Sequence, residues 1–182
     1  LMKAGMELKQ HYVQPMCTPT RASFLTGRYP SRFGPHATVP SNLPVIPDGH
    51  PTLPSILGEN GYKSGLFGKW HLGATRGSEP NMFGFDYSYG SLSGGVDPYN
   101  HRYRDGDYSD TWHRNGEKIS EVGHATDLIT QESIEWINNQ NSPWFAYLSF
   151  TAVHAPIKAP AKWISSYRSE IYDQDVQKDE SF

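Results

Sequence analysis

Three short segments of this sequence carry side chains whose types and spacing suit chemistry on an anion. The first is Cys17–Arg28, with the sequence C-T-P-T-R-A-S-F-L-T-G-R. The second is Gly68–Gly73, with the sequence G-K-W-H-L-G. The third is Val153–Pro156, with the sequence V-H-A-P. A thiol, an arginine, a lysine and two histidines are side chains that could together bind an oxyanion and move protons.

In the first segment, Cys17 stands just before a predicted helix. Unpaired backbone N–H groups and the helix dipole favour an anion at that end. Arg21, one turn further on, adds a planar donor fork that matches tetrahedral oxyanions. The alternative is that a lone cysteine serves as a small hydrophobic core residue. With one cysteine in the chain, an internal disulfide framework and a zinc–cysteine cluster are both excluded.

In the second segment, Lys69 and His71 lie two residues apart, so on an extended strand end they point the same way. A cation beside an imidazole can hold an anion and transfer protons; the alternative is a surface lysine next to a structural histidine. His154, in the third segment, follows an apolar run and could equally be a loop histidine bonded to backbone. The acidic and aromatic stretch Asp97–Trp112 could line a sugar site or form a packed loop.

The elements that must position these residues follow from local signals. Helices are predicted from Thr18, the expected cap, to Gly27 and from Thr52 to Asn60, and the strongest helix at Ala125–Asn139. Strands are predicted at Glu7–Val13, at Tyr62–Gly68 and at Trp144–Phe150. The last is a nearly continuous apolar run, typical of a strand covered on both faces. We also expect a helix to end at Gly5, and Ala74–His124 to be largely irregular.

Alternation of helices and strands predicts an α/β sandwich with a mainly parallel sheet flanked by helices. Ligands of such sheets bind beyond the carboxyl ends of the strands. That rule selects the residues that follow the three predicted strands, namely Gln14–Arg21, Lys69–Gly73 and Thr151–Pro156. All three contain the reactive side chains named above.

Composition limits the classes of partner. The formal net charge is −3, from 16 Lys+Arg against 19 Asp+Glu, so nucleic acid is not an expected partner. No apolar run approaches the roughly 20 residues of a membrane span. Leu1 is not an initiator methionine and the C-terminal residues form a polar run, so we expect the chain to be a piece of a longer protein.

Two of these motifs resemble the signatures of the type I sulfatases. The string C-T-P-T-R at Cys17–Arg21, extended through L-T-G-R, is similar to their first signature. Gly61-Tyr62 followed by Gly68–Gly73 is similar to the second. The order, the spacing and the later Val153–Pro156 also fit, over roughly residues 1–163. The resemblance is closest to arylsulfatases of the N-acetylgalactosamine-4-sulfatase kind, and it implies an alkaline-phosphatase-like sandwich, incomplete in this chain: residues 1–182 would be a partial N-terminal catalytic domain.

The resemblance implies a role for each reactive residue. Cys17 would be oxidised to formylglycine by a formylglycine-generating enzyme; one hydroxyl of the hydrated aldehyde would attack sulfur, and the other would later expel sulfate. Arg21 would hold the formylglycine region. Lys69 would bind the diol and a sulfate oxygen, and His71 would assist proton transfer. His154 would contact the sulfate near the leaving oxygen. The substrate would be a sulfated carbohydrate or an aryl sulfate.

The family's metal ligands are where this sequence departs from the pattern. The resemblance implies calcium, or magnesium, as a Lewis acid, held by an Asp-Asp pair and a later Asp-Asn or Asp-His pair. None of these dipeptides occurs here. Cys17, as formylglycine, could supply only a minority of the roughly six or more oxygens such an ion takes. We therefore expect the isolated chain to be inactive or nearly so.

Two alternatives to a sulfatase stay open. One is a non-catalytic relative that binds sulfated glycans in a retained anion pocket. The other is a phosphoesterase of the same superfamily, although members with an unmodified Ser or Thr nucleophile differ from the cysteine signature seen here. The resemblance to sulfatases implies a secreted, periplasmic or lysosomal location for the whole protein.

Overall fold

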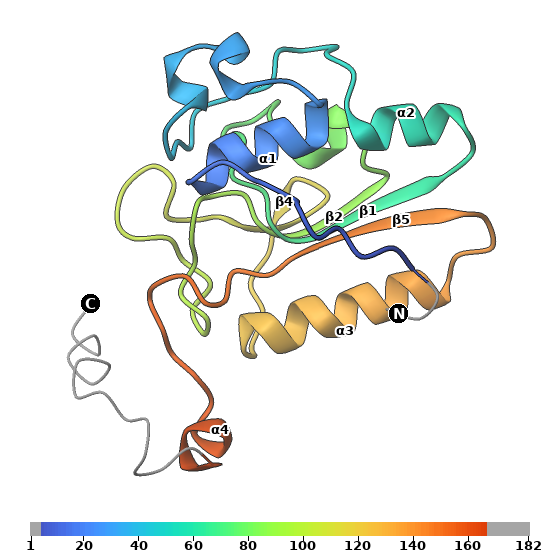
Figure 1. Cartoon of the computed structure of the whole chain (residues 1–182). Coiled ribbons are helices and arrows are strands. Elements are labelled where there is room, and N and C mark those ends of the chain that lie inside the picture. Colours follow the sequence, from blue (N-terminus) through green and yellow to red (C-terminus); the bar gives the residue numbers. More distant parts are fainter. Residues whose placement is uncertain (1–4, 167–182) are drawn as a thin grey trace.

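The computed structural model describes residues 5–166, which form a twisted five-stranded sheet with helices on both faces (Figure 1). The strands are β1 (Lys63–Lys69), β2 (Tyr87–Ser91), β3 (Trp112–Arg114), β4 (Glu117–Lys118) and β5 (Trp144–Ser149), in the order β4-β3-β2-β1-β5. β1 is central and pairs in parallel with both β2 and β5. β3 and β4 extend the sheet as antiparallel strands. The predicted sandwich with a mainly parallel sheet is confirmed.

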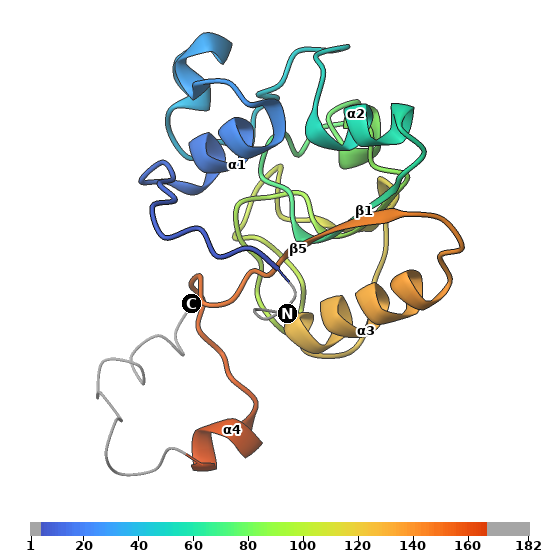
Figure 2. The same ribbon diagram turned by 45° about the vertical axis from the view of Figure 1, so that its right-hand side comes forward.

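Successive side chains of β1 point to opposite faces of the sheet, and a hydrophobic core lies on each face. Leu66 belongs to the core beneath α1 (Cys17–Thr26) and α2 (Leu53–Glu59), together with Ala22 and Leu25. Phe67 belongs to the core beneath α3 (Ala125–Asn138), together with Ile129. Figures 1 and 2 show the same division, with α1 and α2 on one side of the sheet and α3 on the other. Burial of these apolar side chains is the main force that holds the three layers together.

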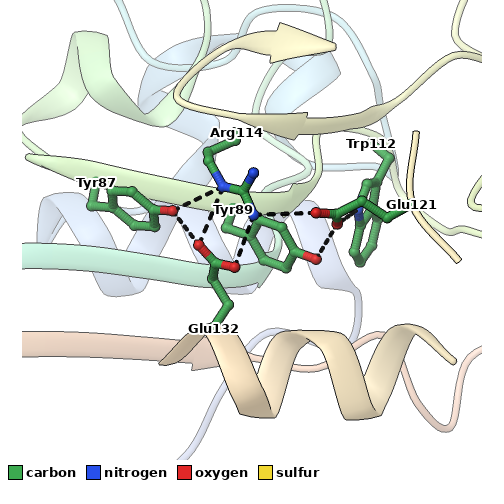
Figure 3. Close-up of polar contacts among 6 residues, drawn as sticks. All are labelled: Tyr87, Tyr89, Trp112, Arg114, Glu121 and Glu132. Atoms are coloured by element: carbon green, nitrogen blue, oxygen red, sulfur yellow. Dashed lines mark hydrogen bonds and ion pairs between the residues drawn. The ribbon is translucent and has the colours of Figure 1, made fainter. Parts of the chain in front are cut away.

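A connected set of polar side chains, here named the tyrosine–arginine cluster, joins α3 to the sheet (Figure 3). Its members are Tyr87, Tyr89, Trp112, Arg114, Glu121 and Glu132. Arg114 Nη2 donates to Glu132 Oε2 at 2.9 Å and to Glu121 Oε1 at 3.2 Å. Tyr87 donates to Glu132, and Tyr89 to Glu121. Because Glu132 lies on α3 and both tyrosines lie on β2, the cluster holds α3 against β2.

The remaining elements are short. Three 3₁₀ turns lie at η1 (Pro30–Phe33), η2 (Pro35–Ala37) and η3 (Pro80–Phe83), and α4 (Ala161–Ser166) follows an extended segment after β5. Within residues 5–166, none of the helices combines the length and the apolar character that crossing a membrane requires.

The predicted helices and two of the predicted strands are confirmed within a residue or two. Thr52 caps α2 as expected, in a reciprocal capping box with Ser55. Gly27 ends α1 in the left-handed conformation, with φ of 64°. The expected helix end before Gly5 falls mostly in residues 1–4, which lie outside the described part of the chain.

Four expectations about the elements are wrong or only partly met. Glu7–Val13 is not a strand: it has no ladder partner among the described residues, and its apolar side chains lie exposed. β5 is covered only in part: Phe145 and Tyr147 pack against the core beneath α1 and α2, and Ala146 packs against the core beneath α3, but Trp144 and Leu148 are exposed. The segment 74–124 is largely irregular, as expected, but it also contains β2, β3 and β4, which are too short to show a clear period in the sequence. Thr18 lies inside α1 and is not its cap.

Candidate functional site

The three reactive segments meet at one edge of the sheet, where β1 and β5 end side by side. Lys69 is the last residue of β1, and the register pairs its neighbour Gly68 with Ser149, the last residue of β5. His71 follows two residues after β1, and His154 lies in the loop that follows β5. α1 brings Cys17 to the same place from above the sheet. The edge is therefore the carboxyl end at which parallel sheets bind their ligands.

Close contact between β1 and β5 depends on Gly68. Its φ is 115°, a region that side chains with a Cβ rarely adopt. A Cβ built on this residue would lie 2.1 Å from the Ser149 carbonyl oxygen, well inside contact distance. The glycine that begins the second motif therefore lets Lys69 sit directly beside the end of β5.

Arg21 holds the two strand ends together. Its Nη1 donates to the Lys69 carbonyl oxygen and to Ser149 Oγ. Ser149 Oγ in turn donates to the same Lys69 carbonyl at 2.9 Å. Burial of the guanidinium lowers the pKa of Arg21, with opposing contributions from Tyr147 and Cys17. The side chain thus acts here as a positioning group for the Lys69 backbone, while its charge remains near Cys17.

The side chain of Lys69 lies against Cys17. Cys17 is the first residue of α1 and is half-buried. Burial lowers the pKa of Lys69, and the charge of Cys17 acts in the opposite direction; the charge of Arg21 lowers this pKa further, and a hydrogen bond to the Cys17 side chain raises it. The lysine that the second motif supplies therefore contacts the residue that the first motif supplies, across 52 positions of sequence.

His71 is buried and held in an unusual backbone conformation. Its φ is 58°, in the left-handed region that non-glycine residues seldom occupy. Its carbonyl accepts from Thr18 Oγ1 at 3.3 Å, and its N–H donates to the Leu92 carbonyl at 3.0 Å. The imidazole ring lies on Gly94, where a Cβ would come within 2.3 Å of Nε2.

The electrostatic surroundings of His71 are those of an anion site. Burial lowers the pKa of His71 to about 3, and the positive charges of Lys69, Arg21 and His154 add to the effect. The ring is therefore neutral at pH 7. Its Nδ1 is buried and has no hydrogen-bond partner. A buried polar atom without a partner is uncommon in native proteins, and next to clustered cations it indicates a place for an acceptor-rich ligand.

His154 lies at the mouth of this cluster. Its side chain is exposed, and its backbone N–H donates to the Thr151 carbonyl at 2.8 Å. Nδ1 lies 2.7 Å from the neighbouring Ala155 carbonyl oxygen, so this nitrogen carries the proton when the ring is neutral. Nε2 is then free to meet a ligand.

All five side chains predicted from the sequence, namely Cys17, Arg21, Lys69, His71 and His154, are brought together; we refer to them as the site cluster. The placement of Cys17 differs from the expectation by one residue: the helix begins at Cys17, because Met16 already has extended backbone angles and caps it without a side-chain bond. Within residues 5–166, the charges that act on Arg21, Lys69 and His71 come from Cys17, Tyr147 and the neighbouring cations, and none of them is a carboxylate. The cluster is therefore cationic and suited to an anion.

Sequence reasoning missed two residues that shape this site. Ser149 shares the Lys69 carbonyl with Arg21, and its position at the end of a predicted strand could have identified it. Gly94 supports the His71 ring, but nothing in the sequence near it pointed to a contact with a residue 23 positions earlier. Within residues 5–166, no three His, Cys, Asp or Glu side chains are grouped so that they could hold a metal ion.

Comparison with known proteins finds a match to one family model and similar proteins that are named as sulfatases. The family model described as Sulfatase matches residues 1–180. Arylsulfatase J of Mus musculus is 36% identical over 181 residues, which cover 94% of this chain and 30% of that protein. N-acetylgalactosamine-6-sulfatase of Canis lupus familiaris is 32% identical over 196 residues, which cover 96% of this chain and 38% of that protein.

Solved structures agree with these sequence matches. The structure of Ps i-CgsB in complex with k-i-k-neocarrahexaose superimposes with a TM-score of 0.78 at 30% identity, covering 89% of this chain and 40% of that one. The structure of BT4656 in complex with its substrate D-glucosamine-2-N,6-O-disulfate gives a TM-score of 0.63 at 27% identity, covering 88% and 30%. The chain thus spans between 30% and 40% of the length of these relatives.

Proposed function

Because this chain belongs to the sulfatase family, we propose that the protein that contains it hydrolyses sulfate esters of sulfated carbohydrates or aryl sulfates, and that residues 1–182 contribute one part of its catalytic domain. The observation that carries the proposal is the site cluster itself. A cysteine at the first turn of a helix contacts a buried lysine, with an arginine and two histidines around it and no carboxylate acting on them.

The proposal includes conversion of Cys17 to formylglycine. The surroundings fit a polar, hydroxyl-bearing group at this position: Lys69 already donates toward the residue 17 side chain, and the buried Nδ1 of His71 has no partner. When present, the hydrated formylglycine would supply the oxygen nucleophile that attacks sulfur and displaces the alcohol. Its second hydroxyl would then lose a proton and expel sulfate, which leaves the aldehyde, and addition of water would restore the hydrate.

Each of the other residues then has a role that its surroundings support. Lys69 binds negative charge on the residue 17 oxygen and on a sulfate oxygen, where a buried ammonium is more effective than one in water. His71, neutral at pH 7 because burial and the neighbouring cations lower its pKa to about 3, can donate a hydrogen bond from the ring nitrogen that lacks a partner to an oxygen of residue 17 or of the sulfate. Arg21 keeps the Lys69 backbone in place. His154, at the mouth, can donate a proton to the departing alcohol oxygen.

Calcium or magnesium, expected from the family, is not supported by the residues described here. Residues 5–166 contain no group of ligands that could hold such an ion. A dication of this kind takes about six or more oxygen ligands, so most of them would come from outside this part of the chain. A secreted, periplasmic or lysosomal location remains a prediction from the resemblance.

Mass spectrometry of the peptide between Gln14 and Arg28 tests the maturation step. The intact protein is produced in a host that converts the cysteine of a known sulfatase, and the same sample is assayed with a chromogenic aryl sulfate. We expect formylglycine at position 17, together with turnover of the sulfate ester that Cys17→Ala abolishes.

Ser23→Ala is the matched control, because it removes a hydroxyl without a hydrogen-bond partner from the same helix. Unmodified cysteine in a host that converts the control sulfatase would contradict the proposal and favour a protein that only binds sulfated glycans. Turnover of a phosphate ester but not of a sulfate ester would favour a phosphoesterase.

A further inference from the structure

We propose that a cavity beside His154 binds a second anionic group, a sulfate or a carboxylate, on the sugar next to the one that carries the scissile sulfate. The inference rests on the proposed function and names the substrate class more narrowly, as an oligosaccharide with at least two negative charges. The cavity has a volume of about 590 Å³ and is lined by residues 96–97, 100, 102–105 and 154–156. That volume lies in the range of pockets that hold a small organic ligand, which is larger than a lone sulfate.

The loop that forms one wall of the cavity is held by its own hydrogen bonds. The Asp97 N–H donates to the Arg102 carbonyl at 2.9 Å, and the Tyr103 N–H donates to the Ser109 carbonyl at 2.9 Å. A β-bridge joins Arg102 to Asp110. Arg104 has a φ of 45°, in the left-handed region. A non-glycine residue held in this conformation by a surrounding loop is a feature that often accompanies binding sites.

A salt bridge joins this wall to the loop that carries His154. Lys158 Nζ lies 2.7 Å from Asp97 Oδ2. Burial acts to raise the pKa of Asp97, but the bond from Lys158 and two backbone N–H groups outweigh it and lower that pKa, so the carboxylate stays charged and paired. Both walls of the cavity are therefore fixed relative to each other, and the charge of Asp97 is already neutralised.

The charges that remain favour an anion. Arg102 and Arg104 both line the cavity, and within residues 5–166 neither guanidinium takes part in a salt bridge. Arg104 instead lies over the Tyr103 ring, with Cζ 5.5 Å from its centroid. Asp105 is the one lining carboxylate outside the salt bridge, so two guanidiniums face a single opposing charge. A guanidinium fork matches the two oxygens of a carboxylate or a sulfate.

Gly95 places this cavity next to the reacting groups. A Cβ at this residue would lie 3.2 Å from Tyr103 Cε2 and 3.4 Å from His154 Nδ1. The Tyr103 ring and the His154 ring therefore both lie against the same glycine. His154 in turn is close enough to His71 for its charge to lower the pKa of that residue. When the sulfate of one sugar reaches the site cluster, that sugar would lie beside His154. The next sugar of the oligosaccharide would then lie beside Tyr103 and the two arginines.

The test compares three disaccharides that share the scissile sulfate and differ on the neighbouring sugar. One carries a uronic acid carboxylate, one a second sulfate ester, and one a neutral hydroxyl. Each is assayed with the intact matured protein and with Arg102→Gln/Arg104→Gln. Arg32→Gln/Arg76→Gln, which changes two exposed arginines outside the site cluster and outside the cavity, is the matched control.

We expect the wild-type protein to prefer at least one dianionic disaccharide over the neutral one by roughly 10- to 100-fold in kcat/KM, about a factor of ten for each charge-assisted contact. The variant in the cavity should lose that preference, and the control variant should keep it. The sulfate and carboxylate arms show which anion the cavity accepts. An equal rate for all three disaccharides, or the same preference in both double variants, would overturn the inference.

Binding separates this inference from the proposed function. Dissociation constants for the same disaccharides are measured by calorimetry on protein with Cys17→Ala, which cannot form formylglycine. Tighter binding of a dianionic disaccharide that depends on Arg102 and Arg104 supports the subsite even if the protein hydrolyses no sulfate ester. Hydrolysis of an aryl sulfate without any such difference in binding would leave the proposed function in place and reject the subsite.

Discussion

Two polar clusters in this protein each contain an arginine and are organised in opposite ways. In the tyrosine–arginine cluster, two carboxylates surround one guanidinium, and the tyrosine and tryptophan donors all reach an acceptor (Figure 3). In the site cluster, Arg21, Lys69 and two histidines come together without a carboxylate, and His71 Nδ1 has no partner. The first arrangement is complete by itself, whereas the second has positive charge and an unpartnered polar atom that an anionic ligand could satisfy.

The pKa directions express the same difference. Hydrogen bonds to Glu132 raise the pKa of Arg114, so the protein stabilises its charged form. Burial, with the Glu132 contact, raises the pKa of Tyr87 to about 12 and keeps it neutral. In the site cluster, burial lowers the pKa values of Arg21 and Lys69, so the protein disfavours their charged forms. Unfavourable electrostatics of this kind mark functional sites more often than structural ones.

The sharpest way to break the comparison is to remove the cation that contacts residue 17. In the intact matured protein, we expect Lys69→Met to lower kcat for an aryl sulfate by roughly a thousandfold, or about 4 kcal/mol in barrier height. The free energy of unfolding should stay the same or rise, because one of several buried like charges is removed. Lys118→Met, which changes a lysine outside both clusters, is the control. A large loss of stability in Lys69→Met would show that the lysine is structural.

We expect the next largest effect from the close contact between Gly68 and the Ser149 carbonyl, beside the site cluster. Gly68→Ala would place a Cβ against the Ser149 carbonyl in an unfavourable backbone conformation, so we expect the free energy of unfolding to fall by about 3 kcal/mol or more. Gly58→Ala is the matched control: its Cβ meets nothing within 4 Å on α2, and it should stabilise the protein by about 0.5 kcal/mol. Urea unfolding measures both. A stable Gly68→Ala variant would mean that β1 and β5 are not packed as described.

Breaking the tyrosine–arginine cluster should affect stability and leave the chemistry intact. Arg114→Met leaves Glu121 and Glu132 without their cation, and we expect a loss of about 2 kcal/mol, less than for a fully buried pair because the arginine is 40% exposed. Aryl sulfate turnover well below the unfolding temperature should be unchanged. Thermal unfolding and a rate assay on one sample measure both effects. A fall in kcat without a loss of stability would remove the distinction between the two clusters.

A buried histidine outside both clusters sharpens the electrostatic part of the comparison. Burial, aided by Lys118, lowers the pKa of His113 to about 3. The unfolded chain binds this proton below about pH 6.5, but the folded chain does not until about pH 3, so stability is lost as the pH falls through that window. Between pH 7.5 and pH 5.5, the free energy of unfolding of His113→Asn should therefore fall by about 1 kcal/mol less than that of the wild type. Unfolding curves at both pH values would contradict this if the variant and the wild type lose stability equally.

Local patterns in the sequence were enough to predict much of the framework. Thr52 and Ser55 form the predicted start of α2, and Ala125–Asn138 follows the helical spacing of its apolar residues. Lys63–Lys69 and Trp144–Ser149 are strands, as their apolar composition indicates. These elements could be predicted because their signals lie within a few residues of one another. The motifs at Cys17–Arg21 and Gly68–Gly73 likewise identified the family.

Contacts between distant residues were decided only by the tertiary structure. Glu7–Val13 has strand-like composition but forms no strand, since a strand requires a partner that the segment itself does not specify. β2 and β3 could not be recognised, yet they pair because β1 and the tyrosine–arginine cluster place them side by side. The contact of Gly94 with His71, and the position of Arg102 and Arg104 near His154, could likewise not be predicted from the sequence. The sequence determined which residues could do chemistry, and packing of the chain determined which of them meet, because burial, charge and distance depend on neighbours that are far away in sequence.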